Sequence, residues 1–457
     1  MNILIINGSP KGQYSTTLHT CLYLQKRFSG HSFEVLDAGQ RIKSLQKDFS
    51  PAIEAISRAE LIIFSYPVYT FLAPSQLHTF IALMKEAHRD GRLDLDGKVA
   101  TQVTTSKHFY DITAHRYIED NCADMGLAFI DGLSADMDDL LTEKGRKEAE
   151  DFFKIVLWSI SKGYFKKPSV EPYAFAPVKV EYPDLAEILP FERPEGSGGK
   201  RVVIVADWKE DDTQLRAMVS RFKARLPYEC DVVNIGEFPF LGGCVSCFNC
   251  ATTGKCIYKD GFDTFLRENI HKHDAIVYAF RISDHSMGCR FKMYDDRQFC
   301  NGHRTVTMGT PFAYLVSGAL SKEENLRTVI EARAQVGGNF LAGIATDECD
   351  PCAEIDRLAD TLIYALANGH SCPQNFYGVG GMKIFRDLIF LMRGMMRADH
   401  KFFKSHGQYD FPQKKFGTSL KMYLVGALLG NSKLRAKMGS KMNEGMIKPY
   451  RKVVDNA

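Results

Sequence analysis

Four cysteines lie close together near the middle of this 457-residue chain, in the stretch GGCVSCFNCATTGKC. They follow the pattern C-x2-C-x2-C-x5-C, and their positions are Cys244, Cys247, Cys250 and Cys256. The glycines around them allow one loop to turn several thiolates toward a single point, as a [4Fe–4S] cluster requires. The spacing therefore favours an iron–sulfur cluster.

Two other uses of these thiols stay open. Zinc also takes four thiolates, although structural zinc sites usually draw on two separated pairs of ligands. The loop can also hold no metal. Disulfides are disfavoured because Met1 leads directly into a strand-like segment with no signal-peptide pattern, which predicts a cytoplasmic protein whose thiols stay reduced.

A second candidate site lies in GSPKGQYSTT, residues 8–17, between a predicted strand and a predicted helix. Hydroxyls and backbone N–H groups at a helix N-terminus suit a phosphate. The chain contains neither a Walker A loop nor G-x-G-x-x-G, which disfavours a P-loop or a dinucleotide Rossmann site. Taken alone, the segment fits an anion-binding loop and an ordinary capped turn equally well.

The predicted third strand ends in Pro67, Val68 and Tyr69 and is followed by a helix that starts near Pro74. With the G-S-P loop, this P-x-Y turn resembles the flavodoxin-like NAD(P)H-dependent FMN reductase family. The resemblance implies FMN as cofactor and NAD(P)H as co-substrate. It implies that the phosphate meets Ser9, Lys11, Ser15, Thr16 and Thr17, and that the flavin ring meets Pro67, Val68 and Tyr69. By position only, a third family loop is TTSKHFY, with Thr105 and Ser106 at the ring edge.

The periodicity of apolar residues and the positions of turn-forming residues predict the helices and strands that position these residues. Apolar strands alternate with amphipathic helices twice, which predicts two tandem α/β domains with parallel sheets. The resemblance implies that both domains are flavodoxin-like and doubly wound. The predicted strands of the first domain are 2–7, 32–37, 61–66, 99–105 and 127–133, and those of the second are 200–207, 230–235, 274–280, 311–318 and 339–346. The predicted boundaries are 1–165, a Pro-rich linker at 166–200, 201–370, and a C-terminal extension at 371–457.

In the second domain, the order of strand, cysteine loop and helix resembles the iron–sulfur flavoprotein family over about residues 200–370. Its first loop is ADWKEDDTQL, and Glu210, Asp211 and Asp212 place negative charge where a phosphate would bind. We therefore expect no FMN in the second domain. The resemblance implies a cluster that approaches a flavin across paired domains, so the hypothesis is that FMN in the first domain exchanges electrons with a cluster in the second.

The C-terminal extension is basic. From Gln374 to the end there are 16 Lys/Arg against 5 Asp/Glu, although the whole chain carries only +3. Residues 381–404 predict a basic amphipathic helix, which favours packing on the chain's own domains and leaves open a peripheral membrane contact or an acidic partner. No nucleic-acid reading motif is present, so nucleic acid is not expected as a partner. A homo-oligomer stays open.

Together these features predict a flavin-dependent oxidoreductase that passes electrons from NAD(P)H to a small-molecule or protein acceptor. The alternatives are a cluster-free NAD(P)H flavin or quinone reductase and a non-enzymatic electron carrier. Flavin supplies the chemistry in each case. No side chain is therefore predicted to act as a general acid or base.

Overall fold

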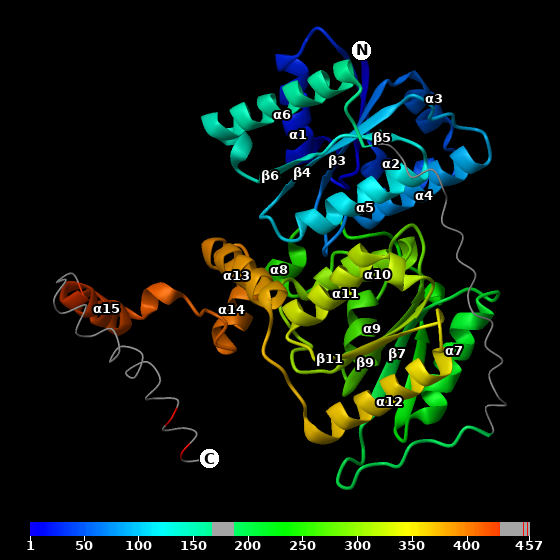
Figure 1. Ribbon diagram of the computed structural model, residues 1–457, viewed down its shortest axis with the longest axis vertical. Coiled ribbons are helices and arrows are strands. Elements are labelled where there is room, and N and C mark those ends of the chain that lie inside the picture. The colour runs from blue at the N-terminus through cyan, green and yellow to red at the C-terminus, as the bar shows by residue number, and fades with distance from the viewer. Residues whose placement is uncertain (167–186, 430–450, 452–454, 456–457) are drawn as a thin grey trace. The chain divides into compact units, whose positions relative to one another are not determined.

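The computed structural model describes residues 1–166, 187–429, 451 and 455. Most of the predicted linker, at 167–186, lies outside the described residues. The chain divides into two compact units, Met1–Lys401 and Phe402–Ala457. Both sheets lie in the first unit (Figure 1). We call residues 2–162 the first lobe and residues 201–368 the second lobe.

The first lobe is a parallel sheet in the order β2-β1-β3-β4-β5, with β6 also paired to β4. This is the flavodoxin order. Its strands are β1 Asn2–Asn7, β2 Ser32–Leu36, β3 Leu61–Pro67, β4 Val99–Ser106, β5 Ala128–Phe129 and β6 Leu133–Asp136. Its helices are α1 Thr16–Arg27, α2 Ala38–Leu45, α3 Ser50–Arg58, α4 Ser75–Arg89, α5 Asp111–Asp124 and α6 Glu143–Lys162.

The second lobe repeats this topology. Its parallel sheet runs β8-β7-β9-β10-β11 from one edge to the other. The strands are β7 Arg201–Asp207, β8 Glu229–Asn234, β9 Ala275–Arg281, β10 Phe312–Ser317 and β11 Leu341–Thr346. The helices are α7 Thr213–Arg225, α8 Asn249–Thr253, α9 Phe262–Asn269, α10 Cys289–Arg297, α11 Glu324–Gly337 and α12 Pro351–Asn368. Two doubly wound sheets confirm the predicted fold class.

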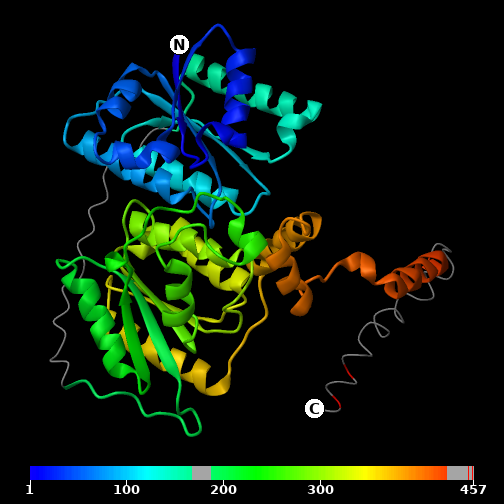
Figure 2. The same ribbon diagram turned by 180° about the vertical axis from the view of Figure 1, so that it is seen from behind.

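Alternate residues of each central strand face opposite layers, as the pleat requires. In β1, Ile3 and Ile5 pack with α1 and α6, whereas Leu4 and Ile6 belong to a core on the other face. That second core is continuous with apolar residues of α9, α10 and α11 in the second lobe. The outer face of the second sheet has a separate core with α7 and α12 (Figure 2). The two lobes therefore share one buried apolar layer.

Helices α4 and α10 pack against each other within this layer, and buried polar groups fix their contact. Asp296 of α10 accepts a hydrogen bond from the backbone N–H of Ser75, 2.8 Å away, at the first residue of α4. The four N–H groups that open a helix have no partner inside it, and a carboxylate suits that end of the helix dipole. The second lobe thus supplies the N-terminal cap of a helix in the first.

The single helix predicted at 381–404 is wrong in its extent: residues 392–396 are not helical and separate α13, Phe376–Leu391, from α14, Arg397–Ser405. Helix α13 packs against α11, and Arg386 and Ile389 are buried. The apolar side of α13 therefore packs on the chain's own lobes. The last described helix, α15 Phe416–Leu429, lies in the second compact unit.

Candidate functional site

One cavity of about 300 Å³ lies beside the carboxyl ends of β1, β3 and β4, and it contains nearly every predicted site residue. In a doubly wound sheet this is the edge where ligands bind. The first-lobe residues that line it include Ser9, Lys11, Ser15, Thr16, Pro67, Val68, Tyr69, Thr105 and Ser106. The second lobe contributes Cys244, Cys247, Cys250 and Cys256. Its volume falls in the range of small-molecule sites.

The G-S-P loop meets α1 at one end of the cavity. Ser15 caps α1, since its hydroxyl accepts the backbone N–H of Leu18 at 3.3 Å. Thr17 is fully buried below the surface and its hydroxyl lies 2.6 Å from that of Thr105, so it joins the first loop to the third rather than lining the cavity. Lys11 has no carboxylate partner among the described residues, and its ammonium lies 5.3 Å from the Phe248 ring centroid. The loop thus offers a free cation beside a helix N-terminus.

The P-x-Y turn continues into a tight, left-handed bend. Tyr69 and Leu72 exchange two backbone hydrogen bonds, of 2.8 and 3.1 Å. Between them Thr70 and Phe71 have φ values of 43° and 71°, a region that residues with a Cβ rarely occupy and that is maintained only when the surroundings impose it. Here the second lobe imposes it, because the Lys292 ammonium donates to the Tyr69 carbonyl at 2.7 Å.

Lys292 is fully buried and also forms an ion pair with Asp296 four residues later. A buried ammonium needs such a partner, since desolvation of an unpaired charge is costly. This pair therefore connects two features of the first lobe, the P-x-Y turn through Lys292 and the start of α4 through Asp296. No sequence pattern indicates either role, because Lys and Asp at i, i+4 look like an ordinary exposed helix pair.

The cysteine loop rests directly on the start of α4. Gln76 donates to the Cys244 carbonyl at 3.2 Å, and a Cβ on Gly243 would clash with the Ser75 hydroxyl. Glycine at 243 therefore allows this close approach without displacing the Ser75 and Gln76 side chains. Ser246 and Phe248, on either side of Cys247, have φ values of 50° and 60°, a backbone form that makes concave nests in iron–sulfur and phosphate sites.

Donors surround the thiol sulfurs. The Ser246 N–H lies 3.5 Å from Cys244 Sγ, and Arg297 Nη2 lies 3.8 Å from Cys256 Sγ. Arg297 is also paired with Asp260 at 2.7 Å and stacks over the Tyr258 ring. Burial raises the pKa of the Cys244 thiol, and it raises that of Cys250 to about 11, so both are protonated at neutral pH and metal binding would release their protons.

The four thiols are suitable ligands for a metal, but they are not arranged around one point. Within residues 1–166 and 187–429, no three His, Cys, Asp or Glu side chains are arranged to hold a metal ion. The four cysteines share a cavity wall and would have to draw together around a cluster. Their role as ligands stays a prediction.

The electrostatics and the remaining wall of the cavity suit a flat anionic ligand. The charged side chains lining it are Lys11, Lys107 and Arg297, and none of the described lining residues is acidic. Helix α13 closes one side with Ile384, Phe385 and Leu388. The Phe385 ring stacks on Phe109 at 4.6 Å and meets His303 edge-on at 4.9 Å. Two neighbouring apolar residues, Leu391 at the end of α13 and Met395 after it, are exposed.

The corresponding position of the second lobe is different. Its turn from Ser283 to Ser286 has the same paired backbone hydrogen bonds, of 2.9 and 3.0 Å, and the same two left-handed residues, Asp284 and His285. These side chains are committed to ion pairs with Lys85 and Asp124 of the first lobe. The acidic loop before α7 folds on itself, with Asp212 accepting the Lys209 N–H at 2.8 Å. This arrangement favours the expectation that the second lobe binds no FMN.

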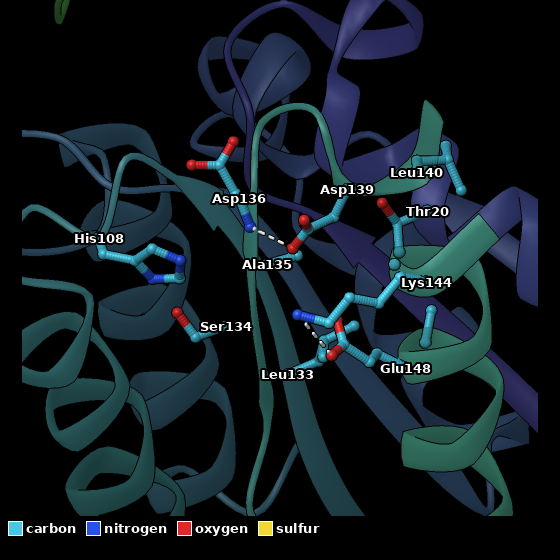
Figure 3. Close-up of a pocket in the computed structure, with 12 residues that line it drawn as sticks. Thr20, His108, Leu133, Ser134, Ala135, Asp136, Asp139, Leu140, Lys144 and Glu148 are labelled. Atoms are coloured by element: carbon cyan, nitrogen blue, oxygen red, sulfur yellow. Dashed lines mark hydrogen bonds and ion pairs between the residues drawn. The ribbon is translucent and has the colours of Figure 1, made fainter. Parts of the chain in front are cut away.

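A second cavity, of about 370 Å³, lies elsewhere in the first lobe between β6 and α6 (Figure 3). Its polar groups bond to one another: the Asp136 N–H donates to Asp139 at 2.8 Å, and Lys144 lies 3.4 Å from Glu148. It has no large aromatic surface apart from the His108 ring. It therefore resembles a hydrated surface cleft more than a flavin site.

A known family model matches most of the first lobe. Residues 1–124 match the family model for NADPH-dependent FMN reductase. The N-terminal part of the chain is thus similar to this family. The match covers β1 through α5, including the G-S-P loop, the P-x-Y turn and TTSKHFY, and it confirms the predicted NAD(P)H-dependent flavoprotein oxidoreductase with FMN as its cofactor.

Several solved structures are similar to about a third of the chain. A flavoenzyme NAD(P)H:(acceptor) oxidoreductase from Paracoccus denitrificans is 16% identical with a TM-score of 0.29, covering 36% of this chain and 99% of its own. A Trp repressor binding protein from Bacillus subtilis is 21% identical with a TM-score of 0.26, covering 33% and 96%. An FMN-dependent NADH-azoreductase from Bacillus anthracis, in complex with FMN, is 13% identical with a TM-score of 0.25, covering 36% and 100%. No curated protein matches the sequence.

Proposed function

We propose that FMN binds in the cavity between the lobes and that the four cysteines hold a [4Fe–4S] cluster which exchanges electrons with it. The observation that carries this is the common cavity, because the predicted flavin loops of the first lobe and all four thiols of the cysteine loop line it together. The Tyr69 hydroxyl bonds to Ser246 of the cysteine loop. The two predicted cofactor sites are therefore in direct contact.

The chain's own residues have separable tasks in this proposal. Lys11 and the start of α1 neutralise the phosphate, while Pro67, Val68 and Tyr69 offer a flat apolar surface to the ring. The Phe385 side of α13 excludes water. Arg297 and the Ser246 N–H donate to sulfur, which stabilises negative charge on the thiolates. When bound, the flavin would accept two electrons from a donor such as NAD(P)H and pass them on one at a time, as a cluster requires.

The test is anaerobic reconstitution with FMN, iron and sulfide, followed by quantification of each and of zinc. We expect bound FMN with iron and acid-labile sulfide in equal amounts, and NAD(P)H should bleach both chromophores. Cys250→Ser should lose the iron and keep FMN. Cys372→Ser is the matched control, since Cys372 is exposed and outside the cavity. Stoichiometric zinc without sulfide would contradict the cluster.

A second candidate is a cluster-free NAD(P)H flavin or quinone reductase. It is favoured because the four thiols are not arranged around one point in the described part of the chain. In that case reconstituted protein retains FMN, contains no iron and oxidises NAD(P)H with a small quinone as acceptor. Cys250→Ser would then leave turnover unchanged. Loss of FMN binding itself would contradict both candidates.

A further inference from the structure

Helix α15 is apolar around most of its circumference and yet exposed. Only Lys421 is charged among its 14 residues. Four apolar side chains recur at the i, i+4, i+7 and i+8 positions of one face, and their exposed fractions are 77% for Phe416, 63% for Leu420, 79% for Tyr423 and 61% for Leu424. A helix apolar on most sides is normally buried in a core or a bilayer. Contiguous exposed apolar surface of this kind marks an interaction site.

The charge of the second compact unit indicates what covers this face. Residues Phe402–Ala457 contain 11 Lys/Arg and 3 Asp/Glu, a net charge of +8. Lys415 and Lys421 are exposed beside the apolar face. Cations that flank exposed apolar side chains complement a surface that is anionic outside and apolar beneath. A second copy of the chain would instead bring another +8 to the contact.

The length of α15 distinguishes lying on a membrane from crossing it. The apolar stretch ends at Leu429, because Gly430, Asn431, Ser432 and Lys433 follow it in the sequence. As a helix its fourteen residues span about 21 Å, less than the roughly 30 Å of a bilayer core. Within the described residues no helix has both the length and the apolar character to span a membrane. Apolar stretches of 10–14 residues are typical of core helices and of interfacial segments, and the exposure of α15 favours the interfacial position. There Phe and Leu enter the acyl boundary and Lys reaches back to the headgroups.

We propose that α15 anchors this protein in the surface of an anionic lipid bilayer. The helix lies in the plane of the interface with Phe416, Leu420, Tyr423 and Leu424 inserted. Lys415 and Lys421 contact lipid phosphates. Neither FMN nor a cluster takes part, so the proposal is independent of the function proposed above.

The experiment is flotation of the full-length protein with vesicles of phosphatidylcholine alone and of a phosphatidylcholine–phosphatidylglycerol mixture. We expect partition into the anionic vesicles that weakens at high salt, and little into the neutral ones. The triple variant L420Q/Y423Q/L424Q should lose at least tenfold of this partition. Its matched control is L141Q/Y164Q/L189Q, which removes three apolar side chains of similar exposure elsewhere.

A second pair of variants tests the charge. K415Q/K421Q should weaken anionic partition, with about fivefold expected for each lysine near the surface. K26Q/K272Q changes the net charge equally at exposed sites outside the second compact unit and should change partition little. Equal binding of the wild type to neutral and anionic vesicles overturns the proposal. So does a triple variant that binds vesicles normally but converts an oligomer to a monomer, because α15 would then contact a second copy.

Discussion

At the scale of single residues, the proposed flavin site depends on a lysine from the other lobe. Lys292 has no exposed surface, and its bond to the Tyr69 carbonyl maintains the left-handed bend at Thr70 and Phe71. Two non-glycine residues in this region cost about 1–3 kcal/mol each. Without the ammonium, the turn would relax and the ring would lose its preformed surface.

Replacement of Lys292 by Met should therefore weaken FMN binding by about tenfold, measured by flavin fluorescence titration. Removing one member of a buried ion pair also destabilises the fold by about 3–5 kcal/mol, so K292M/D296N, which removes both charges, is the decisive variant. It should fold more stably than K292M and still bind FMN weakly. Lys85→Met is the control, since Lys85 joins the lobes at Asp284 without contacting the P-x-Y turn. Normal FMN affinity in K292M/D296N would show that the lysine serves stability alone.

At the scale of elements, the strands were predictable and their assembly was not. The apolar runs at Asn2–Asn7 and Leu61–Pro67 are buried on both faces, so composition and length identify them. The family resemblance indicated the three predicted flavin loops, and strand order predicted that they converge, because parallel strands end at one edge. Nothing in the sequence indicated that α10 caps α4 or that α13 closes the cavity. Such contacts depend on how amphipathic helices pair, and many pairings satisfy the same periodicity.

Helix α13 should control which acceptors enter. Phe385→Ala removes the ring that stacks on Phe109, so the KM for a flat apolar quinone should rise about tenfold, as expected for loss of an aromatic contact and its buried area. The kcat/KM for ferricyanide, a small anion, should stay the same. Phe376→Ala is the matched control on the same helix, because Phe376 is 84% exposed and does not line the cavity. Equal changes for both acceptors would mean that α13 does not select them.

At the scale of the whole molecule, a charged cluster joins the lobes beside the shared apolar core. His285 lies 3.0 Å from Asp124 of the first lobe and 3.0 Å from Glu323 of its own lobe. Lys85 bonds to Asp124 and Asp284 at 2.7 and 3.1 Å. Burial alone would lower the pKa of His285, but the hydrogen bonds to Asp124 and Glu323 raise it to about 10.

The cluster gives stability a specific pH dependence. The folded pKa of His285 lies above its unfolded value, which is about 6.5. Its contribution is therefore complete below pH 6.5 and is lost as the pH rises toward 10. Chemical denaturation across this window should show a falling free energy of unfolding. In His285→Gln that slope should flatten, and stability at pH 6 should fall by about 1–3 kcal/mol.

His88→Gln is the control for this effect, because His88 bonds to the Leu93 carbonyl within the first lobe at 3.0 Å. It should keep the slope of the wild type. Asp124 affects stability at the acidic end of the pH range. Burial would raise its pKa, but the bonds to His285 and Lys85 lower it to about 2, so its contribution is lost only in strong acid. An unchanged slope in His285→Gln would assign the pH dependence to other groups.

The common cavity has a consequence for behaviour on dilution. Its two walls, the flavin loops and the cysteine loop, belong to one polypeptide, so their encounter is intramolecular and their effective concentration does not depend on how much protein is present. A site built between two separate subunits would come apart as the enzyme is diluted below their dissociation constant. Here the specific activity should stay constant down to the lowest concentration that can be assayed, and every chain carries its two halves in a fixed one-to-one ratio.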